Sequence, residues 1–204
     1  MPKRFVFPVI VSAVVLLHAT PAAAQGQVFG YARLGYGAAF AEQTRRAPAI
    51  GLGLRAELDT FAVDVSVANF ALAFDPYDDM SGVAVGSWLK LEALRYLTPD
   101  AQGSAYLGGG LSWGRVSIDR GGESGATSWH GSGLQGELTG GYEMGRHSDI
   151  RIFVQANAAL PLFRARSFTY SYSRTESGIE TSAGVQRRYI PSAVVSIGLG
   201  WQRR

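Results

Sequence analysis

Cysteine is absent from all 204 residues of the chain. Disulfide bonds, thiol catalysis and thiolate metal sites are therefore excluded. If the chain is exported to an oxidising compartment, its stability must come from another form of closure, such as a sheet that closes on itself.

Long apolar stretches are also missing. The longest run, Phe5–Leu17, is shorter than the ~20 residues of a membrane-spanning helix. Lys3 and Arg4 precede this run, and small residues follow it up to Ala24, which is the pattern of a secretory signal peptide. We therefore predict a cleaved signal over residues 1–24, with cleavage between Ala24 and Gln25, and a single mature domain over residues 25–204.

The mature chain has little net charge. Loss of the two cations in the signal lowers the formal charge from +3 to +1. Nucleic-acid binding needs a clustered cationic face, so this balance excludes it as an expected partner. Glycine is abundant, with 26 residues, and each glycine inside an apolar segment weakens a helix by ~1 kcal/mol. The composition favours strands.

Eight segments alternate apolar and polar residues, as strands with one apolar face do. In residues 150–163, for example, Ile152 and Val154 alternate with Arg151 and Gln155. Each segment has ten residues or more, the length that a tilted membrane strand needs. The segments are Val28–Phe40, Ala49–Leu58, Phe61–Phe74, Val83–Leu97, Ser104–Ile118, Leu134–Gly145, Ile150–Phe163 and Ile190–Trp201.

The connections between these segments alternate in length. Residues 59–60, 98–103 and 146–149 make short connections, whereas 119–133 and 164–189 are long. Short turns at one end and long loops at the other are typical of an outer-membrane barrel whose N-terminus is periplasmic.

Two hairpin segments, Glu92–Gly114 and Gln135–Gly145, are rich in glycine and aromatic residues, and the last strand ends in Trp201. In these features the chain resembles the small outer-membrane barrels of the OmpA, OmpX and OmpW type. The resemblance implies an all-β fold, a closed eight-stranded antiparallel transmembrane up-and-down β-barrel. It also implies a monomer in the cell outer membrane, placed there by the barrel-assembly machinery. In that group the final aromatic usually ends the chain, whereas three residues follow Trp201 here.

A periplasmic, lipocalin-like barrel is the soluble alternative, with the apolar face turned inward. Aromatic residues near the strand ends favour the membrane, because they match an interfacial girdle. The charges on the expected outer face also fall at strand ends, where they can reach water. The aromatic residues are Tyr36, Phe40, Phe61, Tyr96, Trp113, Tyr142 and Trp201, and the charges are Arg95, Arg115, Arg146, Arg164 and Arg166.

The polar face would line the lumen with four cations and five anions. An eight-stranded barrel is only wide enough for side chains to fill it, and buried charges must be paired. We expect an ion-pair network that plugs the barrel rather than a conducting pore. Its expected members are Arg33, Arg55, Glu57, Asp64, Lys90, Glu92, Glu137, Glu143 and Arg151.

Candidates for chemistry are few. His130, Ser132 and Glu137 have the residue types of a hydrolase triad, and some small barrels modify lipid A, but His130 is expected in a flexible loop. A calcium site at Asp75, Asp78 and Asp79 lacks the glycine-spaced loop of such sites, so a solvated loop is favoured. We expect no enzyme activity, no cofactor and no metal.

The expected extracellular rim is rich in arginine, which pairs bidentately with phosphate. The rim is therefore a candidate contact for lipopolysaccharide, with ordinary solvated charges as the alternative. The candidates are Arg45, Arg46, Arg115, Arg164 and Arg166.

The connection 164–189 is expected to extend the last hairpin above the membrane, where strand edges can pair with another protein. We therefore expect a structural or surface-interaction role. A lipid A deacylase and an OmpW-like conduit for small apolar molecules are the alternatives.

Overall fold

The computed structural model describes residues 27–41, 44–74, 82–122, 125–175 and 178–202. These residues form ten strands, and none of their segments is a helix long and apolar enough to cross a membrane. The expected signal peptide, its Ala24–Gln25 cleavage site and the aspartates 75, 78 and 79 lie outside these ranges. The strands are β1 (Gln27–Phe40), β2 (Thr44–Leu58), β3 (Phe61–Phe74), β4 (Gly82–Tyr96), β5 (Gly103–Gly122), β6 (Gly125–Met144), β7 (Ile150–Pro161), β8 (Ala165–Thr175), β9 (Gly178–Arg188) and β10 (Ser192–Trp201).

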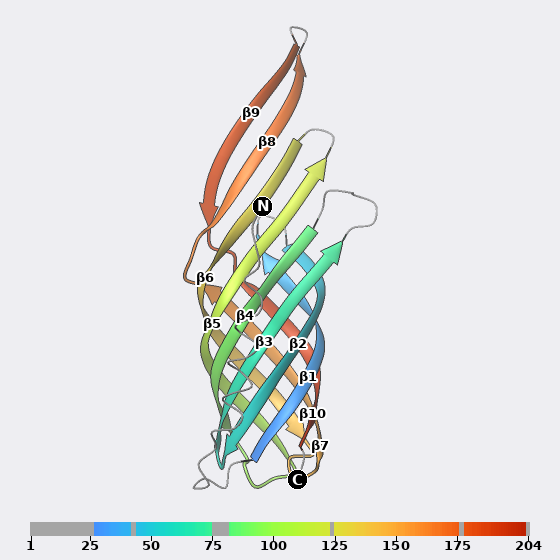
Figure 1. Ribbon diagram of the computed structural model, residues 1–204, viewed down its shortest axis with the longest axis vertical. Coiled ribbons are helices and arrows are strands. Elements are labelled where there is room, and N and C mark those ends of the chain that lie inside the picture. Colours follow the sequence, from blue (N-terminus) through green and yellow to red (C-terminus); the bar gives the residue numbers. More distant parts are fainter. Residues whose placement is uncertain (1–26, 42–43, 75–81, 123–124, 176–177, 203–204) are drawn as a thin grey trace, which may run out of the picture.

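Eight of the strands close into an antiparallel barrel, as the sequence predicts (Figure 1). Strands β1 to β7 follow one another around the wall, and β10 closes it between β7 and β1. The closing ladder runs from Gly30 opposite Trp201 to Ala39 opposite Ser192. The short connections 59–60, 97–102 and 145–149 lie at one end, which we call the periplasmic end by analogy with outer-membrane barrels.

The apolar face of each strand points outward. In β7, Ile152 and Val154 are each 44% exposed, whereas Arg151 and Phe153, which alternate with them, are fully buried. A continuous exposed band of large apolar side chains is unfavourable in water and matches the hydrocarbon core of a bilayer. The soluble, lipocalin-like alternative is therefore wrong, because its apolar face would have to lie inside.

A β-bulge changes the alternation within β4. With a strict period of two, Val83 and Val85 would share the outer face with Leu89, but both side chains are buried in the barrel. The β4–β5 register shifts between Ser87 and Leu89, and Trp88 and Leu89 are both exposed. The extra residue shifts the alternation by one, so that residues before the bulge face the opposite side from the one that a strict period of two predicts.

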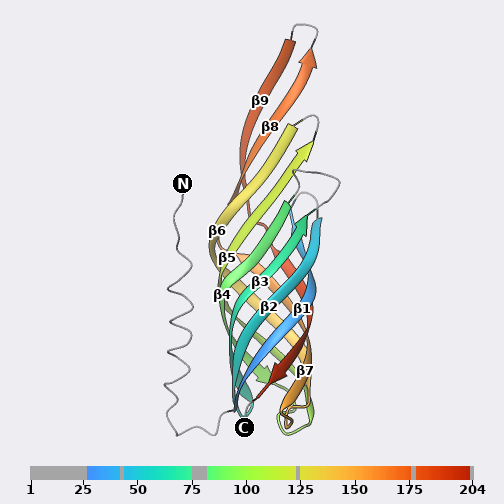
Figure 2. The same cartoon turned by 45° about the vertical axis from the view of Figure 1, so that its right-hand side comes forward.

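Strands β5 and β6 are longer than the sequence indicates. The expected long loop 119–133 is instead a continuation of their hairpin, which pairs from Gly103–Met144 up to Gly122–Gly125. The glycine and serine content of this stretch predicted a loop. Main-chain pairing between β5 and β6 makes it part of those strands instead. Strand β2 likewise begins at Thr44 rather than Ala49. The two long strands project well above the rest of the barrel (Figure 2).

The connection between β7 and β10 forms a separate hairpin, β8–β9, at the top of the molecule (Figure 1). It does not prolong β7 and β10 as expected. Its strand β8 pairs with the upper part of β6, from Gly125–Ser171 to His130–Arg166. Pro161 ends β7 and Pro191 precedes β10, and neither can donate a main-chain hydrogen bond to continue the barrel ladder.

Candidate functional site

The barrel interior holds a balanced set of buried charges. All nine residues that the sequence places in the lumen are buried, and Arg146 joins them with 5% of its surface exposed. Within the described residues the buried charges are therefore five cations and five anions. The cations are Arg33, Arg55, Lys90, Arg146 and Arg151, and the anions are Glu57, Asp64, Glu92, Glu137 and Glu143.

Arg55 of β2 lies at the centre of this network and is fully buried. Its Nε donates to Asp64 Oδ2 at 3.0 Å, and its Nη1 donates to Glu143 Oε2 at 2.9 Å. The remaining Nη2 donates to Gln155 Oε1 at 3.1 Å. Tyr106 adds a second hydrogen bond to Gln155 Oε1 at 2.8 Å, and its ring centroid lies 4.9 Å from the guanidinium carbon. One guanidinium thus connects β2 to β3, β6 and β7.

Two further arginines lie closer to the periplasmic end, where both contact Glu57 and one of them shares Glu143 with Arg55. Arg151 Nη1 lies 2.9 Å from Glu57 Oε1 and donates to Glu143 Oε1 at 3.0 Å. Arg146 Nη2 donates to Glu57 Oε1 at 3.4 Å, and its guanidinium carbon lies 3.8 Å from the centroid of the Tyr96 ring.

Arg146 and Tyr96 both depart from the sequence prediction, which placed Arg146 at a strand end of the outer face and Tyr96 in the aromatic girdle. Gly145 adopts a φ of 74°, a left-handed conformation that favours glycine. This turn carries Arg146 into the barrel mouth, where it also donates to the Pro99 carbonyl. Tyr96 lies on the inner face of β4 and donates to Glu143 Oε2 at 2.8 Å. The signal in the sequence that could have suggested this is a glycine directly before the arginine of a short connection, since glycine readily adopts left-handed turns.

A second group lies further from the periplasmic end. Lys90 Nζ is 2.8 Å from Glu92 Oε2, and Thr139 donates to the other oxygen of Glu92. Arg33 and Glu137 are different, because no ion pair within the described residues involves either of them. Arg33 donates to Asn157 at 3.5 Å and to Ser66 at 3.3 Å. Glu137 accepts from Ser112 at 2.6 Å and from Ser87 at 3.0 Å.

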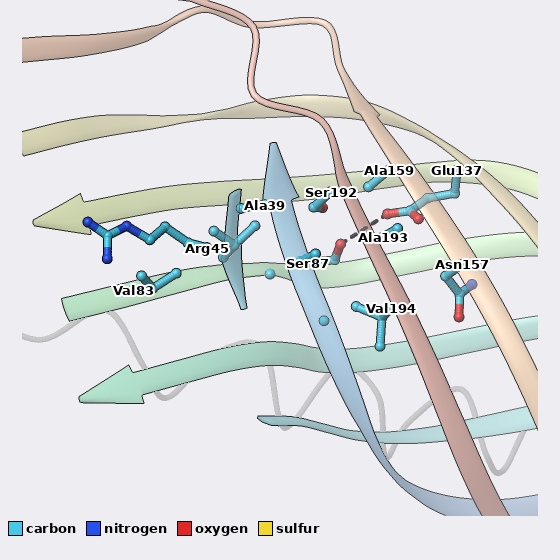
Figure 3. Close-up of a pocket in the computed structure, with 14 residues that line it drawn as sticks. Ala39, Arg45, Val83, Ser87, Glu137, Asn157, Ala159, Ser192, Ala193 and Val194 are labelled. Carbon is cyan, nitrogen blue, oxygen red and sulfur yellow. Dashed lines mark hydrogen bonds between the residues drawn. The ribbon is translucent and has the colours of Figure 1, made fainter. Parts of the chain in front are cut away.

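Two hollows approach the network from opposite ends. On the extracellular side, a cavity of about 20 Å³ is lined by Arg45, Val83, Ser87, Glu137 and nearby small residues (Figure 3). A cavity of that volume has room for a water molecule rather than for a substrate. The periplasmic mouth has a polar hollow of about 320 Å³ that includes Glu57 and Arg146. The two sets of lining residues do not overlap, and the Arg55 contacts lie between them.

The upper lumen above the charges is apolar. Its buried cluster comes from β1, β4, β5, β6, β8 and the connection between β9 and β10, and Phe163 packs against it. The cluster consists of Ala39, Val83, Val85, Val116, Ile118, Trp129, Ala165 and Ile190. The lumen is thus polar in its periplasmic part and apolar towards the outside.

The structure does not bring together the three residues considered for a hydrolase. His130 and Ser132 lie on the outer face of β6 and are exposed, whereas Glu137 is buried in the lumen. His130 instead contacts the neighbouring strand β5. Its Nδ1 is 3.1 Å from Ser117 Oγ, and its Nε2 is 3.4 Å from Asp119 Oδ1. Sequence reasoning missed Ser117 and Asp119, because only the β5–β6 register places them opposite and diagonal to His130.

Four of the five rim arginines point outward as expected. Arg46, Arg115, Arg164 and Arg166 are exposed to the surroundings of the barrel. Arg45 is the exception: it lies on the inner face of β2 and lines the extracellular cavity of the lumen.

No protein-family model and no curated protein matches the chain. Solved structures with the same architecture do match. Surface protein A of Neisseria has a TM-score of 0.54 at 13% identity, over 86% of this chain and 97% of that one. The Ail attachment invasion locus protein of Yersinia pestis, solved in complex with the heparin analogue sucrose octasulfate, has a TM-score of 0.52 at 12% identity, over 87% and 99%.

The outer membrane protein OprG of Pseudomonas aeruginosa has a TM-score of 0.52 at 7% identity, over 88% of this chain and 99% of that one. These likenesses establish the fold. Together with the outward apolar band, they show that the chain is a small eight-stranded outer-membrane β-barrel.

Proposed function

We propose that this barrel is a non-enzymatic outer-membrane protein whose lumen is closed and whose work is done outside the membrane. The observation that carries the proposal is the Arg55 contact set, which joins four strands across the lumen. Side chains fill an eight-stranded barrel, and here the buried cations and anions balance. Eight of these ten charges form ion pairs with one another, and such a network favours a rigid support over a path for ions.

The support would carry the extracellular sheet of β5, β6, β8 and β9. This sheet rises above the barrel (Figure 2), and β9 is its free edge. Phe168 and Val185, opposite each other on β8 and β9, are 41% and 62% exposed. Apolar side chains beside an open strand edge are suited to pairing with another chain, so we assign surface contact to this sheet.

Planar-bilayer recording tests the closed lumen. We expect the refolded wild-type protein to show no steady conductance. The variant Arg55→Ala removes the side chain that crosses the lumen and is expected to add flickering openings. Arg95→Ala, an exposed arginine on the outer face of β4, is the matched control and is expected to stay silent. A large, steady wild-type conductance would contradict the proposal.

One observation favours a second candidate, the conduit for small apolar molecules. The β3–β4 ladder pairs Ser66 with Lys90 and then resumes only at Ala71 with Val85. This interruption lies beside Gly86 and Ser87, which line the extracellular cavity. A molecule that crossed the apolar upper lumen could leave sideways there, although the cavity would have to widen first.

Uptake of a small apolar probe, such as octane, by cells that express the barrel tests the conduit. Ala159→Phe fills the cavity from the inner face of β7, and Ala158→Phe on the outer face of the same strand is its control. Uptake that is lowered only by Ala159→Phe would support the conduit. Uptake equal to that of cells without the barrel would exclude it.

A further inference from the structure

Arginines gather on the outward face of the extracellular sheet, directly above the apolar band. The β5–β6 ladder pairs Trp113 with Leu134, both exposed, then Arg115 with Ser132, and then Ser117 with His130. Each step of two residues is about 7 Å along a strand. Arg115 therefore lies one step above the interfacial tryptophan, at the depth of the headgroups of the outer leaflet.

The row continues across the sheet. His130 is opposite Arg166 of β8, and Arg166 is opposite Arg187 of β9. Arg164 lies near this row, with its guanidinium carbon 5.2 Å from the centroid of the Tyr189 ring. Main-chain pairing thus places His130, Arg166 and Arg187 at adjacent positions, all exposed.

Arg166 and Arg187 form a cross-strand pair of like charges. Such a pair destabilises a sheet unless an anion lies between the two groups. Within the described part of the chain neither guanidinium has an ion-pair partner, and Asp119, an acid on the neighbouring strand β5, contacts His130 instead. The pair is therefore suited to an anion that comes from outside the chain.

We propose that this row, formed by Arg115, Arg166 and Arg187, binds the phosphate groups of a phosphorylated glycolipid of the outer leaflet. Guanidinium groups pair bidentately with phosphate, and the site is continuous with the band that contacts the lipid chains. The inference goes beyond the surface role proposed above, because its ligand is a lipid of the same membrane and not another protein chain. It does not depend on a closed lumen, which the conductance measurement tests separately.

Native mass spectrometry of the refolded full barrel in detergent, titrated with bisphosphorylated lipid A, measures this binding. We expect the wild type to retain lipid A and the double variant Arg166→Gln/Arg187→Gln to bind it at least tenfold more weakly, because charge-assisted hydrogen bonds are lost. Arg95→Gln, at the opposite end of the barrel, is the control and should bind as the wild type does. Heat-modifiable migration shows that every variant is folded.

A charge reversal separates the ligand from a structural role. Arg187→Glu converts the like-charged pair into an ion pair, so it should leave the folded barrel at least as resistant to urea while abolishing lipid A retention. Monophosphorylated lipid A should bind the wild type more weakly than the bisphosphorylated form. Equal retention of lipid A by the wild type and by both arginine variants would overturn the proposal. The proposal would also be overturned if the wild type bound free phosphate or sucrose octasulfate as tightly as it binds lipid A.

Discussion

Arg55 shows how much one residue does in this barrel, since three of its nitrogens donate to partners on three other strands. Truncation would leave Asp64 and Glu143 with fewer partners in a buried site, and a buried charge without compensation is costly.

We expect Arg55→Met to lower the free energy of unfolding by about 3–5 kcal/mol, the range for breaking a buried ion pair. Urea titration of the barrel in lipid vesicles, followed by tryptophan fluorescence, measures this change. Arg95→Met removes an exposed arginine and is expected to change stability by less than about 0.5 kcal/mol. Similar values for the two variants would show that the luminal contacts add little.

Glycine at position 198 of β10 makes room for an aromatic ring. A Cβ added there would overlap the ring atoms of Phe153, which is fully buried in the lumen. We expect Gly198→Ala to destabilise the barrel by about 1–3 kcal/mol through overpacking. Gly136→Ala on β6, where the added Cβ has its nearest neighbour at 4.0 Å, is the matched control. A stability of Gly198→Ala equal to that of the control in urea would contradict the packing argument.

At the scale of elements, the β8–β9 hairpin is separable from the barrel. Strand β8 pairs with residues 125–130 of β6, above the β6–β7 ladder, which spans residues 135–144 of β6. Replacing residues 165–188 by a short glycine-rich turn should leave a folded, heat-modifiable barrel. The same deletion should abolish the retention of lipid A, since it removes Arg166 and Arg187. A deletion variant that stays in its unfolded gel position would show that the hairpin is needed for folding.

The elements also show where prediction from the sequence ended. The alternation in β7 indicated both faces correctly, because its period of two runs without interruption from Ile150 to Pro161. In β4 the same method failed at Trp88, because a bulge adds one residue and leaves no sign in the composition. Strands β5 and β6 were predicted too short, since their upper halves carry glycine and serine where apolar residues were expected.

The outward apolar band makes the molecule as a whole a protein that a bilayer solvates and water does not. Boiled and unboiled samples should migrate differently in a detergent gel, and the protein should fractionate with the outer membrane. A freely soluble protein would contradict the assignment of the apolar face to the outside.

The sequence by itself determined the barrel. Strand length, alternation and the spacing of the turns are local properties, so they indicated eight wall strands, most of their faces and nine of the ten charges that are buried. The tertiary structure decided the contacts between distant residues. It brought Arg146 to Glu57, His130 to Ser117, and Arg166 to Arg187. Each of these arrangements depends on strand register, on a left-handed turn or on the pairing of β8 with β6. The alternation of residues within one strand does not determine any of these three features.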